Sequence, residues 1–214
     1  MEMISLHSDL KGSEIRERAL EMMRLVGIRP ERAKDYPHQF SGGMRQRVGI
    51  AIALACKPSL LIADEPTTAL DVTIQAQVLE LIKELQKQVK TSMLLITHDL
   101  GIVAETCDSV AIMYAGRLVE YADIQHLYGN PLHPYTQGLF DAVPDLESPI
   151  GEKLAVIQGL PPDPTNLPRG CSFSPRCPYA QAECLEKPCG MREIEPGHFI
   201  DCYFPHQYEG GSRA

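Results

Sequence analysis

A short apolar run that ends in two acids constrains the fold of this 214-residue chain more than any other feature. Residues 60–63 are Leu-Leu-Ile-Ala, Asp64 and Glu65 follow at once, and Pro58 and Pro66 bound the stretch. Such a run predicts a strand that is buried on both faces of a sheet. Active sites of open α/β sheets lie at the carboxyl ends of their strands. We therefore expect Asp64 to hold Mg²⁺ and Glu65 to steer a water molecule, with a solvated turn as the alternative.

A second feature lies upstream, where Ser41, Gly42 and Gly43 precede a helix-like run at 48–56. Serine is a good helix N-cap, and glycines let a ligand approach the backbone closely. The free N–H groups at a helix start, together with the positive end of the helix dipole, bind anions. The residues thus predict an anion site, although an ordinary capped helix would also explain them.

A third feature is His98, which follows the apolar run Met-Leu-Leu-Ile at 93–96. A single histidine after a strand is more often structural than catalytic. Helices are expected at 13–26, 42–56, 72–89 and 100–106, and a hairpin through Gly116 is expected at 109–121. Strands that alternate with helices predict an α/β fold with a mainly parallel sheet.

Taken in order, four short segments resemble motifs of the ATP-binding subunits of ABC transporters. They match the signature motif, the Walker B strand, the D-loop and the switch histidine, at 41–47, 60–66, 69–71 and 97–99. Further segments resemble the oligopeptide and dipeptide (or nickel) importer branch of this family. They lie at 37–39, 67–77 and 133–136, with Met44 in the signature motif. The resemblance covers residues 10–204.

The resemblance implies how the chain would meet a nucleotide across a subunit boundary. Ser41, Gly42 and Gly43 would clasp the γ-phosphate of an ATP that a second ABC ATPase subunit holds. Gln39 would touch the edge of that nucleotide, and Asp71 would couple the two ATP sites of the dimer.

The resemblance also implies the hydrolytic groups. Asp64 would hold Mg²⁺, Glu65 would act as general base or water positioner, and His98 would contact the γ-phosphate. Positioning and charge neutralisation are what phosphoryl transfer requires of a protein. The implied function is ATP hydrolysis that drives uptake of dipeptides or oligopeptides, together with two membrane-spanning permease subunits and an extracytoplasmic peptide-binding protein.

The sequence contains no Gly-Lys pair and therefore no Gly-x-x-x-x-Gly-Lys-Ser/Thr phosphate cradle. Residues 1–128 thus resemble an N-terminally truncated P-loop-type ABC ATPase sheet with a remnant of the helical subdomain. We expect such a chain to be inactive alone. One alternative is a non-catalytic module that completes the ATP site of another subunit.

Residues 129–214 are rich in proline and predict a loop-rich extension. Five of the seven cysteines lie there, and the segment has too little apolar periodicity to order itself without a cross-link, which a metal would supply. The resemblance implies a 4Fe–4S cluster held by four thiolates, with zinc as the alternative and Cys189 as a surplus thiol. The implied ligands are Cys171, Cys177, Cys184 and Cys202. An iron–sulfur redox or iron-sensing protein is a further alternative function.

The composition limits the classes of partner that the chain could bind. The formal net charge of −8 argues against nucleic acid and anionic lipid. The sequence contains no run of 18 apolar residues, which a membrane-spanning helix would need. The N-terminus lacks the pattern of a signal peptide. The sequence therefore predicts a cytoplasmic protein, peripheral on the inner face of the membrane under the resemblance. Cys56 and Cys107 are expected to be buried core thiols.

Overall fold

The computed structural model describes residues 1–68, 70–143 and 155–208. The chain divides into two compact units, Met1–Thr106 and Cys107–Ala214. Each unit has its own secondary structure and packing, so each is described by itself.

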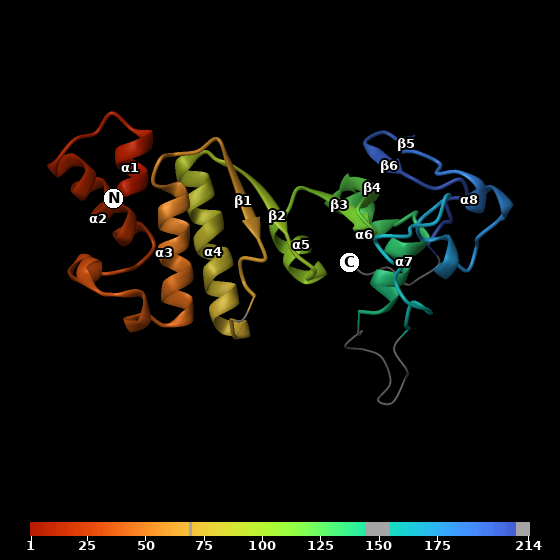
Figure 1. Cartoon of the computed structure of the whole chain (residues 1–214), viewed down its shortest axis with the longest axis horizontal. Coiled ribbons are helices and arrows are strands. Elements are labelled where there is room, and N and C mark those ends of the chain that lie inside the picture. The colour runs from red at the N-terminus through yellow and green to blue at the C-terminus, as the bar shows by residue number, and fades with distance from the viewer. Residues whose placement is uncertain (69, 144–154, 209–214) are drawn as a thin grey trace. The chain divides into compact units, whose positions relative to one another are not determined.

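Helices dominate the N-terminal unit, and α3 and α4 lie side by side in it (Figure 1). Helices α2, α3 and α4 bury one apolar stripe each, with Met22, Leu54 and Val78 among the least exposed side chains. The α-helices are α1 (Glu2–His7), α2 (Ser13–Leu25), α3 (Gly42–Leu54), α4 (Val72–Val89) and α5 (Leu100–Thr106), and the short 3₁₀ helices are η1 (Pro30–Lys34) and η2 (Pro37–Gln39).

The sheet of this unit pairs β1 (Leu60–Asp64) with β2 (Ser92–Ile96) in parallel. Alternate side chains, such as Leu61 and Met93, pack against the helical core. The side chains at the alternate positions of the two strands face away from that core and are exposed. These are Leu60 (51%), Ile62 (60%), Leu94 (51%) and Ile96 (45%). The expectation of a strand buried on both faces is therefore wrong, because only one face of this two-stranded sheet is covered by described residues.

The sheet of the C-terminal unit is antiparallel, with strand order β3-β4-β6-β5. The strands are β3 (Ser109–Tyr114), β4 (Arg117–Asp123), β5 (Arg192–Glu195) and β6 (His198–Ile200). The expected hairpin is confirmed, and its turn uses Ala115 and Gly116 at φ values of +47° and +76°. The expected parallel pairing is found between β1 and β2. The sheet of the C-terminal unit differs from it, because tight turns join β3 to β4 and β5 to β6 and make these pairs antiparallel.

Strand pairing also explains why the C-terminal compact unit begins at Cys107 and not near residue 129. Strand β4 pairs with β6, so the hairpin shares its sheet with the cysteine-rich segment. The remaining helices of the unit are α6 (Ile124–Gly129), α7 (Pro134–Asp141), η3 (Ser174–Arg176) and α8 (Ala182–Glu186). In the part of the chain that the structure describes, no helix is long and apolar enough to cross a membrane. Cys56 and Cys107 were expected to be buried core thiols, but both are only half-buried.

Candidate functional site

The parallel register of β1 and β2 brings their carboxyl ends to one edge of the sheet. Asp64 ends β1, is paired with Ile96 and is exposed. Glu65 follows it, and its backbone N–H donates to the Ile96 carbonyl at 2.9 Å. Glu65 has a φ of +46°, a left-handed conformation that non-glycine residues rarely adopt. Strained backbone of this kind gathers at functional sites, where the surrounding structure holds it in place.

The side chain of Glu65 meets His98 at this edge. Glu65 Oε1 lies 2.7 Å from His98 Nδ1, and the hydroxyl of Thr68 donates to Glu65 Oε2 at 2.9 Å. The hydrogen bond with His98 lowers the pKa of Glu65, and the bond from Thr68 adds a smaller effect in the same direction. The same contact with Glu65 raises the pKa of His98. Sequence reasoning found the acid and the histidine but missed Thr68, whose place in the turn after Glu65 was the available signal.

We predict that the imidazole of His98 titrates above its ordinary pKa of 6.5 and returns towards it in Glu65→Gln. The raised pKa of His98 stabilises the fold fully below pH 6.5 and ceases to do so as the pH rises through the folded value. The lowered pKa of Glu65 stabilises the fold above pH 4.5, until the pH falls through its folded value. Between pH 4.5 and pH 6.5, Glu65 is therefore charged and His98 protonated, so the ion pair is fully formed. NMR titration of the His98 imidazole measures this pKa, with Glu80→Gln, at an exposed position, as the control. A His98 pKa that is not raised in the wild-type chain would contradict the contact with Glu65.

The predicted anion site is an exposed helix start. Ser41 caps α3, and its hydroxyl accepts a hydrogen bond from the N–H of Met44 at 3.3 Å. Ser41 and Gly42 are exposed. A Cβ on Gly43 would lie 2.7 Å from Cγ2 of Ile74, so the first turn of α4 approaches α3 where only glycine fits. The helix start can thus receive an anion from outside this unit.

The other two residues predicted to bind nucleotide make local contacts. Gln39 Oε1 accepts from the N–H of Tyr36 at 2.7 Å, and Asp71 Oδ1 caps α4 through the N–H of Ile74 at 3.0 Å. Both side chains are exposed. Among the residues that the structure describes, no hydrogen bond joins Ser41–Gly43 to the edge with Asp64, Glu65 and His98. The helix start and the strand edge both belong to the N-terminal unit.

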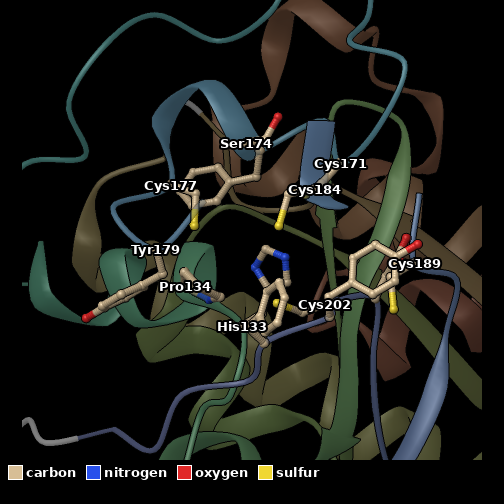
Figure 2. Close-up of a pocket in the computed structure, with 13 residues that line it drawn as sticks. His133, Pro134, Cys171, Ser174, Cys177, Tyr179, Cys184, Cys189 and Cys202 are labelled. Atoms are coloured by element: carbon tan, nitrogen blue, oxygen red, sulfur yellow. The ribbon is translucent and has the colours of Figure 1, made fainter. Parts of the chain in front are cut away.

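Five cysteines of the C-terminal unit line one narrow pocket with a volume of about 20 Å³ (Figure 2), namely Cys171, Cys177, Cys184, Cys189 and Cys202. Burial is the main cause that raises the pKa values of the Cys171, Cys177 and Cys202 thiols, and that of Cys202 rises to about 12. The charges of Cys171, Cys177 and Cys184 add to the effect on Cys202. Cys189 also lines the pocket, but the only cysteine that contributes to its raised pKa is Cys184. The four predicted ligands are thus neighbours, and Cys189 stands to one side.

The donor set limits which group could bind there. The described residues contain no group of three or more His, Cys, Asp or Glu side chains arranged around a single metal ion. Zinc needs thiolates at about 2.3 Å from one point, which this spacing does not give. Thiolates around a 4Fe–4S cube stand farther apart, since each binds a different iron. Four thiolates are the donors that such a cluster takes, but the described residues show no formed metal site and the pocket volume is only about 20 Å³.

His133 is a pocket residue that the sequence gave no reason to place there. Its side chain is 1% exposed and lies among the labelled cysteines in Figure 2. Burial lowers the pKa of His133 to about 4, so its imidazole is neutral at physiological pH. The resemblance of residues 133–136 to a family motif was the available signal, but that motif says nothing of the cysteines.

Comparison with known families agrees with this geometry. Residues 4–68 match the ABC transporter family, and residues 119–184 match the oligopeptide/dipeptide transporter C-terminal region. The chain therefore carries an ABC transporter region and an oligopeptide/dipeptide transporter C-terminal region, as the motifs predicted.

Individual relatives are similar to the chain over nearly all of its length. An oligopeptide transport ATP-binding protein, AppD of Bacillus subtilis, is 50% identical over the whole chain, which covers 65% of that relative. OppD of Escherichia coli is 49% identical over 96% of the chain and 61% of the relative. DppD of Bacillus subtilis, a dipeptide transport ATP-binding protein, is 49% identical over 94% of the chain and 60% of the relative. The chain thus spans less than two thirds of the length of these relatives.

A solved structure supports the fold. The structure of cbiO1 from Clostridium perfringens, part of the ABC transporter complex cbiONQ, matches 58% of this chain and 49% of its own. The two share 34% identity and a TM-score of 0.51. The α/β ABC ATPase fold class is therefore confirmed.

Proposed function

We propose that this chain supplies the signature helix start and the hydrolytic strand edge of an ATP-hydrolysing subunit that energises import of dipeptides or oligopeptides. The contact between Glu65 and His98 carries the proposal, because it places a base and an imidazole at the edge where Asp64 would hold Mg²⁺. The relatives named for peptide transport support the substrate class.

The proposed partners rest on the exposed helix start and on the resemblance to peptide importers. The exposed helix start at Ser41 would meet ATP held by a second ABC ATPase subunit, and two permease subunits with an extracytoplasmic peptide-binding protein would complete the importer. The subunit would then lie on the cytoplasmic face of the membrane. A non-catalytic module that completes the ATP site of another subunit is the second candidate, which the exposed Ser41 and Gly42 favour.

We predict that the purified chain alone releases phosphate from Mg-ATP at the rate of a buffer blank. The 214 residues contain no phosphate cradle to hold the triphosphate in line with Glu65. A phosphate-release assay measures this with Glu65→Gln as the matched variant. Turnover that Glu65→Gln abolishes would contradict the prediction. Acceleration of an intact family subunit by the chain, preserved in Glu65→Gln, would favour the non-catalytic module.

We also propose that the cysteine pocket holds a 4Fe–4S cluster through Cys171, Cys177, Cys184 and Cys202, with Cys189 unbound. The support is that these four thiols border one pocket and that Cys171, Cys177 and Cys184 add to the raised pKa of Cys202. When bound, such a cluster supplies one-electron chemistry and a cross-link between η3, α8 and the segment after β6. Anaerobic incubation with iron and sulfide tests it: about four irons per chain are expected, whereas a colourless zinc-binding protein would contradict it.

A further inference from the structure

The described residues leave one apolar face of the sheet in the N-terminal unit uncovered. Leu61 and Met93 point to the other face, where they pack against the helical core. The register places Ile62 directly beside Leu94, so the outward side chains form one continuous patch. We call this patch the uncovered face; its side chains are 45–60% exposed and belong to Leu60, Ile62, Leu94 and Ile96.

An uncovered face is unusual for parallel strands. Parallel sheets occur almost always with helices on both faces, because the connections between their strands place helices there. Within the described ranges, β1 and β2 pair only with each other, so each strand has an outer edge that no further strand occupies. Such edges offer backbone N–H and C=O groups to another chain. The sheet of this unit can therefore receive both a further strand and a helix.

The relatives and the sequence indicate which kind of segment would fit. The chain covers 65% of AppD, so about a third of that relative lies outside the match. The 214 residues also lack the Gly-x-x-x-x-Gly-Lys-Ser/Thr cradle that holds phosphates. That cradle is built as a strand, a glycine-rich loop and a helix. A segment of this type supplies a strand for the open edge and a helix for the uncovered face.

The position of the strand edge agrees with such a segment. Asp64 and Glu65 lie at the carboxyl end of β1, where ligands of open α/β sheets bind. A strand added in parallel would end at this same edge, and its loop would present backbone N–H groups to phosphate there. The helix that follows a parallel strand packs back onto the sheet, here over the uncovered face.

We propose that the uncovered face and one outer edge of this sheet bind a separate strand–loop–helix segment of an ABC transporter subunit, which brings the phosphate cradle. The inference rests on the proposed function, because it names the partner that the strand edge needs to hold ATP. Apolar burial and backbone hydrogen bonds hold the segment, so its binding needs no nucleotide. In this respect it differs from the proposed ATP-dependent contact at Ser41.

Co-expression of the full chain with the part of AppD outside the match tests the inference. We expect the two to co-purify in equal amounts without nucleotide. Ile62→Glu should weaken the affinity, measured by calorimetry on the separated partners, by about 100-fold or more, because docking would bury its carboxylate without a partner. Ile52→Glu, at a 52% exposed position of α3, is the matched control and should leave the affinity unchanged.

Hydrogen exchange provides a second measurement. In the complex, the amides of 60–64 or of 92–96 should exchange more slowly than in the chain alone, because one of these strands gains backbone partners. Failure to form the complex, or binding that Ile62→Glu does not weaken, would overturn the inference. Self-association of the chain that Ile62→Glu abolishes and the AppD segment does not displace would assign the face to a second copy, and would overturn it too.

The variant Ser41→Arg separates this inference from the proposed function. It should leave binding of the AppD segment unchanged, since the helix start takes no part in the docking. Loss of binding in Ser41→Arg would assign the contact to the helix start and contradict the inference. If no segment binds but ATP-dependent association with an intact family subunit through Ser41 is observed, this inference fails while the proposed function stands.

Discussion

Glu120→Ala is expected to lower the free energy of unfolding of the C-terminal unit by about 3–5 kcal/mol. The Glu120 side chain is fully buried, and its carboxylate accepts the N–H of Leu132 at 2.7 Å and that of His133 at 3.1 Å. It also lies 2.7 Å from Nε2 of His198, which is buried in β6. Alanine would leave these three groups without a partner and would open a cavity between β4, β6 and the turn before α7.

Chemical denaturation followed by circular dichroism measures this loss. Glu195→Ala removes an exposed carboxylate from β5 of the same sheet and should change the stability by no more than about 0.5 kcal/mol. A midpoint for Glu120→Ala equal to that of Glu195→Ala would show that the buried carboxylate does not hold the unit together.

Gly170→Ala is expected to cost about 3 kcal/mol and to deform the cysteine pocket. A Cβ at Gly170 would overlap the carbonyl oxygen of Cys184 and lie 2.7 Å from the carbonyl carbon of Leu185. The clash is with backbone, so no side chain can rotate away from it. The adjacent bond from the N–H of Cys171 to the Cys184 carbonyl, 2.8 Å long, would have to break or lengthen.

Gly129→Ala is the matched control, since a Cβ there meets nothing within 4 Å and the residue lies in α6. It should be neutral or slightly stabilising. Thermal unfolding and iron uptake should both report the difference between the two variants. Equal unfolding temperatures and equal iron content would contradict the close approach at Gly170.

Local patterns predicted the elements of this fold well. The apolar stripe of α4, the serine cap of α3 and the Gly116 hairpin all depend on residues close in sequence. The burial of β1 was not predictable in this way. The sequence of an apolar strand such as 60–64 is the same whether one face or both faces of the strand are covered. Here the face that carries Leu60 and Ile62 is exposed.

Long-range contacts explain what the sequence could not show of the site. Glu65 was predicted from its place at the carboxyl end of an apolar strand, and His98 from the resemblance of the ordered motifs. His133 was missed as a pocket residue because it lies 38 residues or more before the cysteines that surround it. Glu120 was missed because its partner His198 comes from a strand that joins the sheet only in the folded unit.

The most direct test of the proposed shared ATP site is sedimentation velocity of the chain mixed with a family subunit that carries the Gly-x-x-x-x-Gly-Lys-Ser/Thr cradle. We predict association in Mg-ATP, and none in Mg-ADP or without nucleotide. Ser41→Arg should abolish it by filling the exposed helix start, while costing the fold only about 1 kcal/mol from the lost cap. Association that needs no nucleotide, or that survives Ser41→Arg, would contradict the proposal.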